Sequence, residues 1–421
     1  MTVAARKQPA KLIYQGSVKD VWQSPEGEHK LWFEYTDDYS VFDWGKMPDT
    51  ISRKGASLAG LGAFFFKTMA DPGFWRKLQT SPALERFDAN WLAARFNHAV
   101  YSGVDGLTVA GLPSHFLRLT DGADGELDFG KIAGREQEAD GRIFLEVQEA
   151  KVGHPVRHAV LGKEIYFYPT SSIVKDAPSG LALIPLEIVF RFGMPEGSSL
   201  KSRLKKNPSY LTELGLEDMP EEGQWFAHPV VEFFTKLETK DRLLSFQEAS
   251  TMAGLTPEHF ESMVELALCV ALGLYSIFGE KNIELWDGKV EMVLDGRAKS
   301  VARSVLLADS IGPDELRLLY KGQHLSKEII RIYYRGCKWE KAVKEAQDIC
   351  QQKGIADWKG YFNKEYNLSP EPLTAQFKDA IDNLYCVLLN HVSGENVFSN
   401  CPDIETFSTQ LKAALHGGGG K

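Results

Sequence analysis

Residues suited to phosphate binding lie near the amino terminus, where two β-prone runs meet. Gly16, Ser17 and Lys19 stand at the junction between residues 11–14 and 18–22. The backbone amides of a glycine-containing loop, with a lysine beside them, can close over the phosphates of a nucleotide. The alternative is a tight hairpin turn with an exposed lysine, and this short pattern taken alone favours that alternative.

Carboxylates with the spacing of a metal site lie further along the chain. Asp287, Lys289 and Glu291 recur at every second position, so they share one face of an extended segment. Asp309 ends a second apolar run about 18 residues later. Two carboxylates at adjacent strand ends can share Mg²⁺, which prefers oxygen ligands and often keeps nucleotide phosphates in its remaining positions. A solvated hairpin with outward-facing acidic residues fits the pattern equally well.

Arginines suggest a second anion site. Arg191 lies near the end of a predicted strand, with Ser198 in the loop that follows and Arg317 well beyond it. A guanidinium fork, a hydroxyl and a loop amide together can clamp a phosphate. The alternative for each arginine is an ordinary pairing with a surface glutamate. A basic cluster at residues 201–206 could steer an anionic substrate or could be a solvated face.

These side chains need strands and helices to hold them. In residues 31–35, Leu31, Phe33 and Tyr35 fall on one face, which should be buried. Thr256 and Pro257 form a helix-start signal before apolar positions at helical spacing. Strands are predicted at residues 11–14, 18–22, 31–35, 184–192, 290–294 and 304–309, and helices at residues 57–69, 257–278 and within 338–415.

Composition excludes several classes of protein. The chain has 421 residues, of which 43% are apolar and 25% charged, as in an ordinary globular protein of two or three domains. Its formal charge of −9 disfavours nucleic acid and anionic membranes as partners. The longest strongly apolar stretch, residues 266–278, is shorter than the roughly 20 residues that cross a bilayer. The first residues lack the apolar segment of a secretory signal, so we expect a cytoplasmic protein.

Three features resist a functional interpretation. Residues 120–142 are rich in Gly, Asp and Glu and are predicted to form an exposed insertion rather than core. The five cysteines are odd in number and never spaced as CxxC, so we expect reduced, mostly buried thiols. The glycine run at 417–420 is expected to be a frayed tail.

Taken together and in order, several stretches resemble those of one family, the phosphoribosylaminoimidazole-succinocarboxamide synthases, or SAICAR synthetases. The resemblance covers about residues 11–119 and 181–335. The insertion near 120–180 and the segment after 336 are larger than the usual forms of the family. The matching stretches are residues 14–22, 36–43 with Lys54 and Gly55, 185–191 with Gly197 and Ser198, 229–236, and 289–291 with 307–314 and Arg317.

The resemblance implies an α+β protein with a two-lobed ATP-grasp-like or kinase-like fold. An N-terminal antiparallel β lobe would span residues 1–180 and a larger α/β lobe residues 181–335. A helical C-terminal extension would occupy 336–421 and pack outside the core without supplying a catalytic group. The implied activity is that of an ATP-dependent ligase that joins an aminoimidazole ribonucleotide carboxylate to L-aspartate through an acyl phosphate, in a possible homo-oligomer.

The resemblance also implies roles for individual residues. The nucleotide would be held by Gly16, Ser17, Lys19 and Lys236, and Mg²⁺ by Glu291 and Asp309. The ribonucleotide phosphate would be bound by Arg191, Ser198 and Arg317, with Ser40 and Asp43 on the substrate side. Asp287 and Lys289 would lie at the reacting groups.

The sequence departs from the family at Ser310, Gly312 and Ser326, where the family usually has Glu, Ser and Asp. One charge near the metal is therefore missing. Two alternatives to the ligase remain open. One is a related ATP-dependent ligase or small-molecule kinase with a different acceptor, and the other is a non-catalytic scaffold. Dependence of ADP release on L-aspartate would separate these three.

Overall fold

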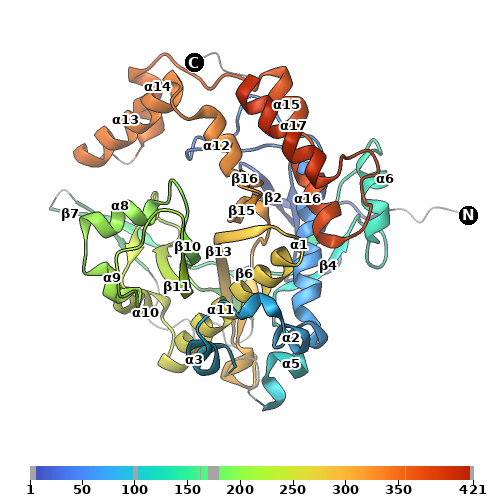
Figure 1. The fold of residues 1–421 in the computed structure, drawn as a ribbon, viewed down its shortest axis with the longest axis vertical. Coiled ribbons are helices and arrows are strands. Elements are labelled where there is room, and N and C mark those ends of the chain that lie inside the picture. The colour runs from blue at the N-terminus through green and yellow to red at the C-terminus, as the bar shows by residue number, and fades with distance from the viewer. Residues whose placement is uncertain (1–5, 98–102, 162, 169–179, 356, 418–421) are drawn as a thin grey trace, which may run out of the picture.

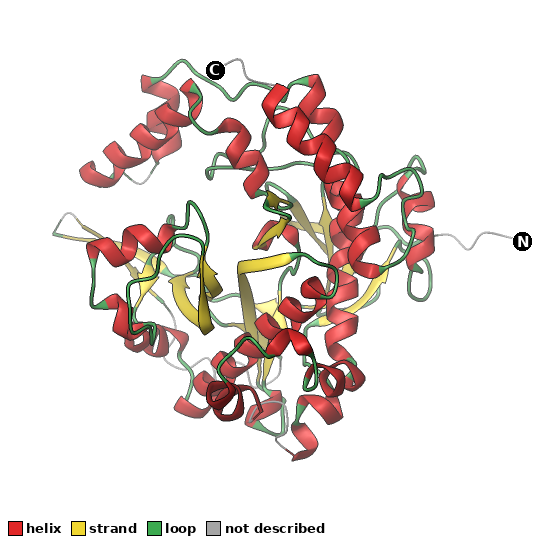
Figure 2. Ribbon diagram, in the orientation of Figure 1, coloured by secondary structure: helices red, strands yellow, loops and turns green. Residues whose placement is uncertain are grey.

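The computed structural model describes residues 6–97, 103–161, 163–168, 180–355 and 357–417. Two β-sheets, with helices packed on and around them, form the two lobes (Figures 1 and 2). The six predicted strands, the helices at 57–69 and 257–278 and the helical pattern of 338–415 are all present, so these predictions are confirmed. The α+β fold class is confirmed as well.

The first sheet is antiparallel throughout its described strands and has the order β1-β2-β3-β5-β4. One face packs on the long helix α1, which follows β3. Burial is not restricted to the predicted face of β3, because Trp32 on the opposite side is fully buried and stacks on Phe144. The strands are β1 (Lys11–Gln15), β2 (Lys19–Gln23), β3 (Lys30–Tyr35), β4 (Phe116–Thr120) and β5 (Phe144–Gln148).

The prediction that residues 120–142 are exposed rather than core is only partly right: residues 124–126 and 137–140 are exposed, but other residues of the segment are buried. Leu127, Ile132 and Arg135 are buried, and Arg135 forms ion pairs with Asp140 at 2.9 Å and Asp121 at 3.5 Å. The larger apolar side chains Leu127 and Ile132 are buried, and charged residues of the segment form ion pairs both within it and with residues outside it, such as Lys7 and Lys67. The low mean hydropathy of the segment did not reveal this packing. The segment leads into β5, the strand that fills the space between β3 and β4.

The second sheet runs in the order β12-β11-β10-β13-β15-β16. Its long strand β13 also pairs, over its second half, with β14 and β9, and β6 pairs with β9. β6 thus joins this sheet although it precedes residue 180; the predicted division into domains stays a prediction. The strands are β6 (Ala150–Lys151), β9 (Leu181–Leu183), β10 (Leu186–Met194), β11 (Gln224–Thr235), β12 (Leu243–Leu244), β13 (Glu284–Asp295), β14 (Val305–Ala308), β15 (Leu316–Tyr320) and β16 (Gln323–His324).

Helix α11 (Pro257–Gly279) packs on the apolar face of the second sheet, against β10, β11 and β13. Thr256 caps its start by accepting a hydrogen bond from the amide of His259. By length and composition this helix could cross a membrane, but 72% of its apolar window is buried inside the protein. We therefore assign α11 as the core helix of the larger lobe.

The helices from α12 onward run across the top of Figure 1 and down its right side, where α16 lies beside α1. Their predicted apolar positions, including Ile381, Leu384 and Leu388, are fully buried, and α16 packs against α1. Gly417 ends the last helix, and the rest of the predicted frayed tail lies outside the described residues. The helices are α12 (Glu328–Tyr334), α13 (Lys338–Lys353), α14 (Trp358–Glu365), α15 (Ala375–Ile381), α16 (Leu384–Ser393) and α17 (Ile404–Gly417).

Smaller elements connect these layers. A separate hairpin of β7 and β8 stands beside the second sheet. The remaining helices are α1 (Lys54–Ala70), α2 (Pro72–Leu78), α3 (Ala89–Trp91), α5 (Leu107–Ala110), α6 (Ile132–Glu136), α8 (Ser199–Lys206), α9 (Tyr210–Glu213) and α10 (Phe246–Ala253), and the hairpin strands are β7 (Val156–Val160) and β8 (Lys163–Phe167).

The expectation of reduced cysteines is wrong for one pair. A disulfide joins Cys386 of α16 to Cys401 of the loop before α17, with 6.7 Å between their Cα atoms. The pairing depends on how the last helices pack, which the spacing of cysteines along the chain does not reveal. Cys269, Cys337 and Cys350 are free, as expected.

Candidate active site

One face of the second sheet carries a row of charged side chains. Strand register places Arg191 of β10 opposite Asp287 of β13, while Glu291 pairs with the last residue of β14, just before Asp309. Side chains alternate along a strand, so Asp287, Lys289 and Glu291 share this face. The other face is apolar and covered by α11, so the charged face lies on the side of the sheet away from that helix.

Lysines and carboxylates alternate along this row. Lys236 Nζ, just after β11, lies 2.5 Å from Glu291 Oε1 and 3.8 Å from Glu187 Oε1. Lys289 Nζ lies 3.1 Å from the same Glu187 oxygen and 3.2 Å from Glu315 Oε2. Glu187 and Glu315 were missed by the sequence analysis. Glu187 could have been found, because it stands four positions before Arg191 on the same strand face.

The hairpin of the smaller lobe reaches this row through one lysine. Lys19 forms an ion pair with Asp309, and its Nζ lies 3.3 Å from Ser310 Oγ. The hairpin needs a glycine at Gly16, because a Cβ there would lie 2.4 Å from the carbonyl oxygen of Lys19. Ser17 lies in the same turn. The geometry therefore brings Lys19, Asp309, Glu291 and Lys236 together.

The surroundings of the two proposed metal carboxylates shift their pKa values in opposite directions. Burial alone would raise the pKa of Asp309, but the ammonium groups of Lys19 and Lys236 outweigh it and hold this pKa below its usual value. Burial, reinforced by the charge of Asp309, raises the pKa of Glu291. Each carboxylate thus has a neighbouring lysine, and they repel each other at close range.

A buried histidine that the sequence analysis missed, His115, contacts the backbone of Asp309. The His115 ring is 3% exposed, and its Nε2 lies 3.3 Å from the carbonyl oxygen of Asp309. Phe33 and Phe66 flank the ring. Burial lowers the pKa of His115 to about 4, so the ring is neutral at physiological pH. No sequence pattern pointed to this residue, because its partners come from distant segments.

The predicted phosphate clamp is assembled around buried carboxylates. Arg191 forms an ion pair with Glu232, which is 1% exposed, and donates to Asp287 Oδ2 at 2.6 Å. Arg317 Nε lies 3.5 Å from the other oxygen of Asp287. Arg203 of α8 also pairs with Glu232, at 2.7 Å. Neither Glu232 nor Arg203 was assigned by the sequence analysis.

Ser198 lies at the rim of this arginine cluster. It caps the start of α8, where its Oγ accepts a hydrogen bond from the amide of Leu200 at 3.3 Å. Arg317 reaches the same loop by donating to the carbonyl oxygen of Glu196 at 3.5 Å. Arg191 and Arg317 are therefore brought together around Asp287, and Arg317 also reaches the loop that carries Ser198.

Ser40 and Asp43 lie in the segment between β3 and α1. Ser40 Oγ accepts a hydrogen bond from Gly45 at 3.3 Å, and the adjacent Trp44 packs on aromatic rings of α13 and α14. Asp43 is close enough to Asp241 for its charge to contribute to the raised pKa of that carboxyl, which comes mainly from burial. The contacts described for Ser40 do not join it to the charged row.

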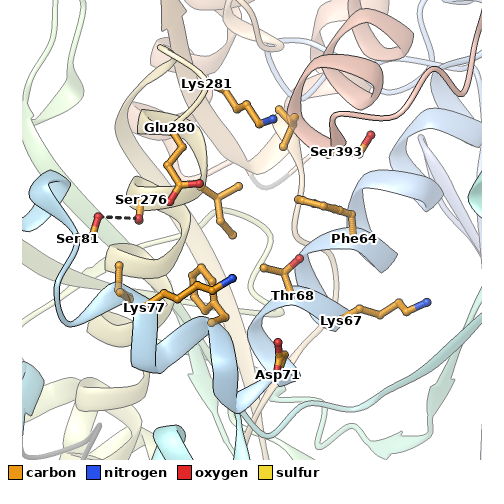
Figure 3. A pocket seen from close by; sticks show the side chains of 14 residues that line it. Phe64, Lys67, Thr68, Asp71, Lys77, Ser81, Ser276, Glu280, Lys281 and Ser393 are labelled. Atoms are coloured by element: carbon orange, nitrogen blue, oxygen red, sulfur yellow. Dashed lines mark hydrogen bonds between the residues drawn. The ribbon is translucent and has the colours of Figure 1, made fainter.

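A separate cavity of about 520 Å³ lies away from this site, among the ends of α1, α2, α11 and α16 (Figure 3). Lys77 and Lys281 extend into it, and Ser81 and Ser276 share a hydrogen bond of 3.4 Å at its wall. Lys67, Asp71 and Glu280 also line it. None of the residues predicted from the sequence to act in catalysis or binding lines it.

The residues present fit a magnesium ion that is shared with a nucleotide. Within the described residues, no group of three or more His, Cys, Asp or Glu side chains is arranged as a metal site by itself. Glu291 and Asp309 supply two carboxylates, and Mg²⁺ commonly takes one or two carboxylates plus phosphate oxygens and waters. The lysines that now pair with both carboxylates would be free to contact the phosphates instead.

This fold and site define a two-lobed, nucleotide-dependent enzyme in which a hairpin lysine meets the carboxylates of a charged sheet. The SAICAR synthetase profile matches residues 12–92 and 148–346, about two thirds of the chain. The chain belongs to the SAICAR synthetase family, and its function is that of an ATP-dependent ligase of purine biosynthesis. Of the insertion expected near residues 120–180, only the part up to residue 147 lies in the unmatched segment, residues 93–147.

Individual relatives agree with this assignment. A protein of Archaeoglobus fulgidus, which bears the name phosphoribosylaminoimidazole-succinocarboxamide synthase provisionally, is 30% identical over 95% of this chain and 99% of its own. The synthase of that name from Thermoplasma volcanium is 24% identical over 91% of this chain and 99% of its own. Both matches are long enough to include much of the C-terminal helical segment.

A solved structure supports the fold. SAICAR-synthase from Saccharomyces cerevisiae, complexed with SAICAR, superposes with a TM-score of 0.51 over 93% of this chain and 99% of its own, at 18% identity. The two-lobed fold is therefore shared, including most of the C-terminal helices.

Proposed function

We propose that this protein joins 5-amino-1-(5-phosphoribosyl)imidazole-4-carboxylate to L-aspartate, with ATP as the phosphoryl donor, on the charged face of the second sheet. The observation that carries the proposal is the row in which Lys19, Lys236 and Lys289 alternate with carboxylates. The reaction brings a triphosphate, a carboxylate and an amine together, and such a row can hold each negative group beside a lysine.

The first step activates the carboxylate. One of its oxygens attacks the γ-phosphorus of ATP, the bond from that phosphorus to the β,γ-bridging oxygen breaks, and ADP leaves with the bridging oxygen. Lys19 and Lys236 are proposed to hold the nucleotide phosphates, because their ammonium groups pair with Asp309 and Glu291, the proposed magnesium carboxylates. The product is an acyl phosphate, a far better acyl donor than a carboxylate.

The second step forms the amide. The neutral amine of aspartate attacks the acyl carbon, the carbon–nitrogen bond forms, the bond to the phosphate oxygen breaks, and the nitrogen releases a proton. Lys289 and Asp287 are proposed to lie at the reacting carboxylate. Burial opposes the charge of Lys289, but Glu315 and Glu187 outweigh it and raise the pKa of this lysine, so it stays cationic beside the developing oxyanion.

Glu291 and Asp309 are proposed to hold Mg²⁺, which would neutralise phosphate charge during transfer. Arg317, Ser198 and Arg191 are proposed to bind the ribonucleotide phosphate at the start of α8. Arg191 has two carboxylate partners already, so we expect Arg317 and the loop amides to provide most of the contact. Ser40 and Asp43 remain predictions for the substrate side, as do cytoplasmic location and a possible homo-oligomer.

One assay tests the proposal. ADP release is measured with ATP, Mg²⁺ and the carboxylated ribonucleotide, with and without L-aspartate, and the amide product is identified by mass spectrometry. We expect ADP release that requires both substrates. L-Glutamate, which is longer by one methylene, is the matched control. ADP release without aspartate would indicate a kinase, and nucleotide binding with no turnover would indicate a scaffold.

A further inference from the structure

A buried ionic cluster that the proposed mechanism does not use lies beneath the active-site loop. Its centre is the carboxylate of Asp314, which is 11% exposed. Tyr385 of α16 donates a hydrogen bond to Oδ1 at 2.5 Å, and Lys54 Nζ of α1 lies 3.0 Å from Oδ2. Lys54 and Tyr385 are both fully buried. Three segments that are distant in sequence thus meet at one carboxylate.

Asp314 lies in the loop that connects the two halves of the site. The loop 309–317 comprises the turn between β14 and β15 together with the first two residues of β15, with Asp309 at one end and Arg317 at the other. Glu315, beside Asp314, contacts Lys289 at 3.2 Å. A shift of Asp314 would therefore be transmitted to the proposed metal carboxylate, the phosphate-binding arginine and the lysine at the reacting groups.

Neighbouring ammonium groups stabilise the ionised carboxylate of Asp314. Burial would raise the pKa of Asp314, but the ammonium groups of Lys54 and Lys327 outweigh it, and this pKa is lowered. Burial, with the charge of Asp314, raises the pKa of Tyr385 well above its usual value, so its hydroxyl remains a donor. Asp314 is the only acidic side chain that pairs with Lys54 among the described residues.

We infer that Tyr385 is a positioning residue for the active site: its hydroxyl, with Lys54, fixes Asp314 and thereby the loop 309–317. The inference rests on the proposed function for the roles of this loop. The C-terminal helical segment would then contribute to catalysis, although none of its side chains would contact the substrate. A phenylalanine would fill the same space, so the hydroxyl rather than the ring carries the positioning.

The chain offers a matched control. Tyr320 OH donates to Glu405 at 2.8 Å, which is also a tyrosine–carboxylate bond between the sheet core and the C-terminal helices. It does not involve the loop. Tyr385→Phe and Tyr320→Phe therefore delete the same kind of bond, one beneath the loop and one away from it.

We expect Tyr385→Phe to raise the KM for the ribonucleotide about tenfold, the loss typical of one hydrogen bond to a charged group, and to raise the KM for ATP much less. Hydrogen–deuterium exchange of residues 309–317 should quicken in this variant. Tyr320→Phe should leave both KM values and this exchange unchanged.

Unchanged KM values and unchanged loop exchange in Tyr385→Phe, with only a lower melting temperature, would overturn the inference. Asp314→Asn decides the question if Tyr385→Phe does not fold, because it keeps the acceptor for Tyr385 and weakens the pair with Lys54. It should show the same selective rise in KM, and wild-type KM values would overturn the inference. Faster loop exchange in an enzyme whose wild type releases no ADP would uphold the positioning and refute the proposed function.

Discussion

The two sheets contribute to the site in different ways. Every residue of β1 is exposed, and its hairpin with β2 brings one charged group, Lys19, to the carboxylates. On the second sheet nine of the twelve residues of β13 are buried, and Asp287 and Lys289 have charged partners on the neighbouring strand β10. The charged face of the larger lobe is thus held by ion pairs between its own strands. The smaller lobe reaches this face through a hairpin whose first strand is exposed. A site built this way can admit a nucleotide without rearranging its substrate side.

The strongest test of a fixed surface is to remove one of its central charges. We expect Arg191→Ala to lower the free energy of unfolding by about 3–5 kcal/mol, because the buried Glu232 would lose one of its three side-chain partners, Arg191, Arg203 and Tyr210. The variant should also weaken the ribonucleotide far more than ATP. Arg297→Ala, which removes an exposed partner of Asp295, is the control and should cost at most about 1 kcal/mol. Equal stability of the two variants in urea would show that the larger lobe is not held by its paired charges.

Asp309→Asn tests the point where the two lobes meet. We expect normal folding with a loss of a hundredfold or more in ADP-forming activity, about 3 kcal/mol in the transition state. Glu291→Gln should also fold normally and lose activity to a similar extent. Normal turnover by either variant at ordinary Mg²⁺ concentrations would remove the metal assignment. Circular dichroism provides the folding control.

His115 contacts the carbonyl oxygen of Asp309, where the two lobes meet, and its titration should make the free energy of unfolding depend on pH. Its folded-state pKa of about 4 is below the ordinary 6.5, so the stability that it contributes is complete above pH 6.5 and is lost as the pH falls toward 4. The full difference is about 3 kcal/mol. His115→Gln, which does not titrate, should therefore lose less stability than the wild type between pH 7 and pH 4. Parallel curves for the two proteins in urea unfolding at each pH would contradict this.

The smallest effect is expected from the hairpin of β1 and β2, which contributes Lys19 alone to the described ion pairs of the charged row. Lys19→Gln should raise the KM for ATP roughly tenfold, the worth of one charge-assisted contact, and should leave the melting temperature nearly unchanged. Lys11→Gln, in the same hairpin but outside the described ion pairs, is the matched control. A large drop in stability of Lys19→Gln would show that the smaller lobe is held as firmly as the larger one.

Local patterns predicted the parts of the site that lie along single strands. Alternation placed Asp287, Lys289 and Glu291 on one face, and the glycine turn before Lys19 predicted the hairpin correctly. These features depend only on the geometry of an extended chain and its turns. The start of α11 at Thr256 was predictable for the same reason.

Features that depend on distant segments could not be predicted in this way. Glu232 became visible as a partner of Arg191 only once β10 and β11 were paired. The burial of His115 and the contact of Tyr385 with Asp314 require the packing of separate lobes and helices. The disulfide between Cys386 and Cys401 has the same origin.

The order of strands in the first sheet also bears on how the chain folds. β1, β2 and β3 are consecutive hairpins, so they can form as soon as about 35 residues have left the ribosome. The partner of β3 is β5, which is synthesised about 110 residues later. Until then, β3 presents an unpaired edge, the kind of surface through which nascent chains associate with one another. Slower translation of the intervening residues would lengthen that exposure, whereas a chaperone bound to the early hairpins would protect it.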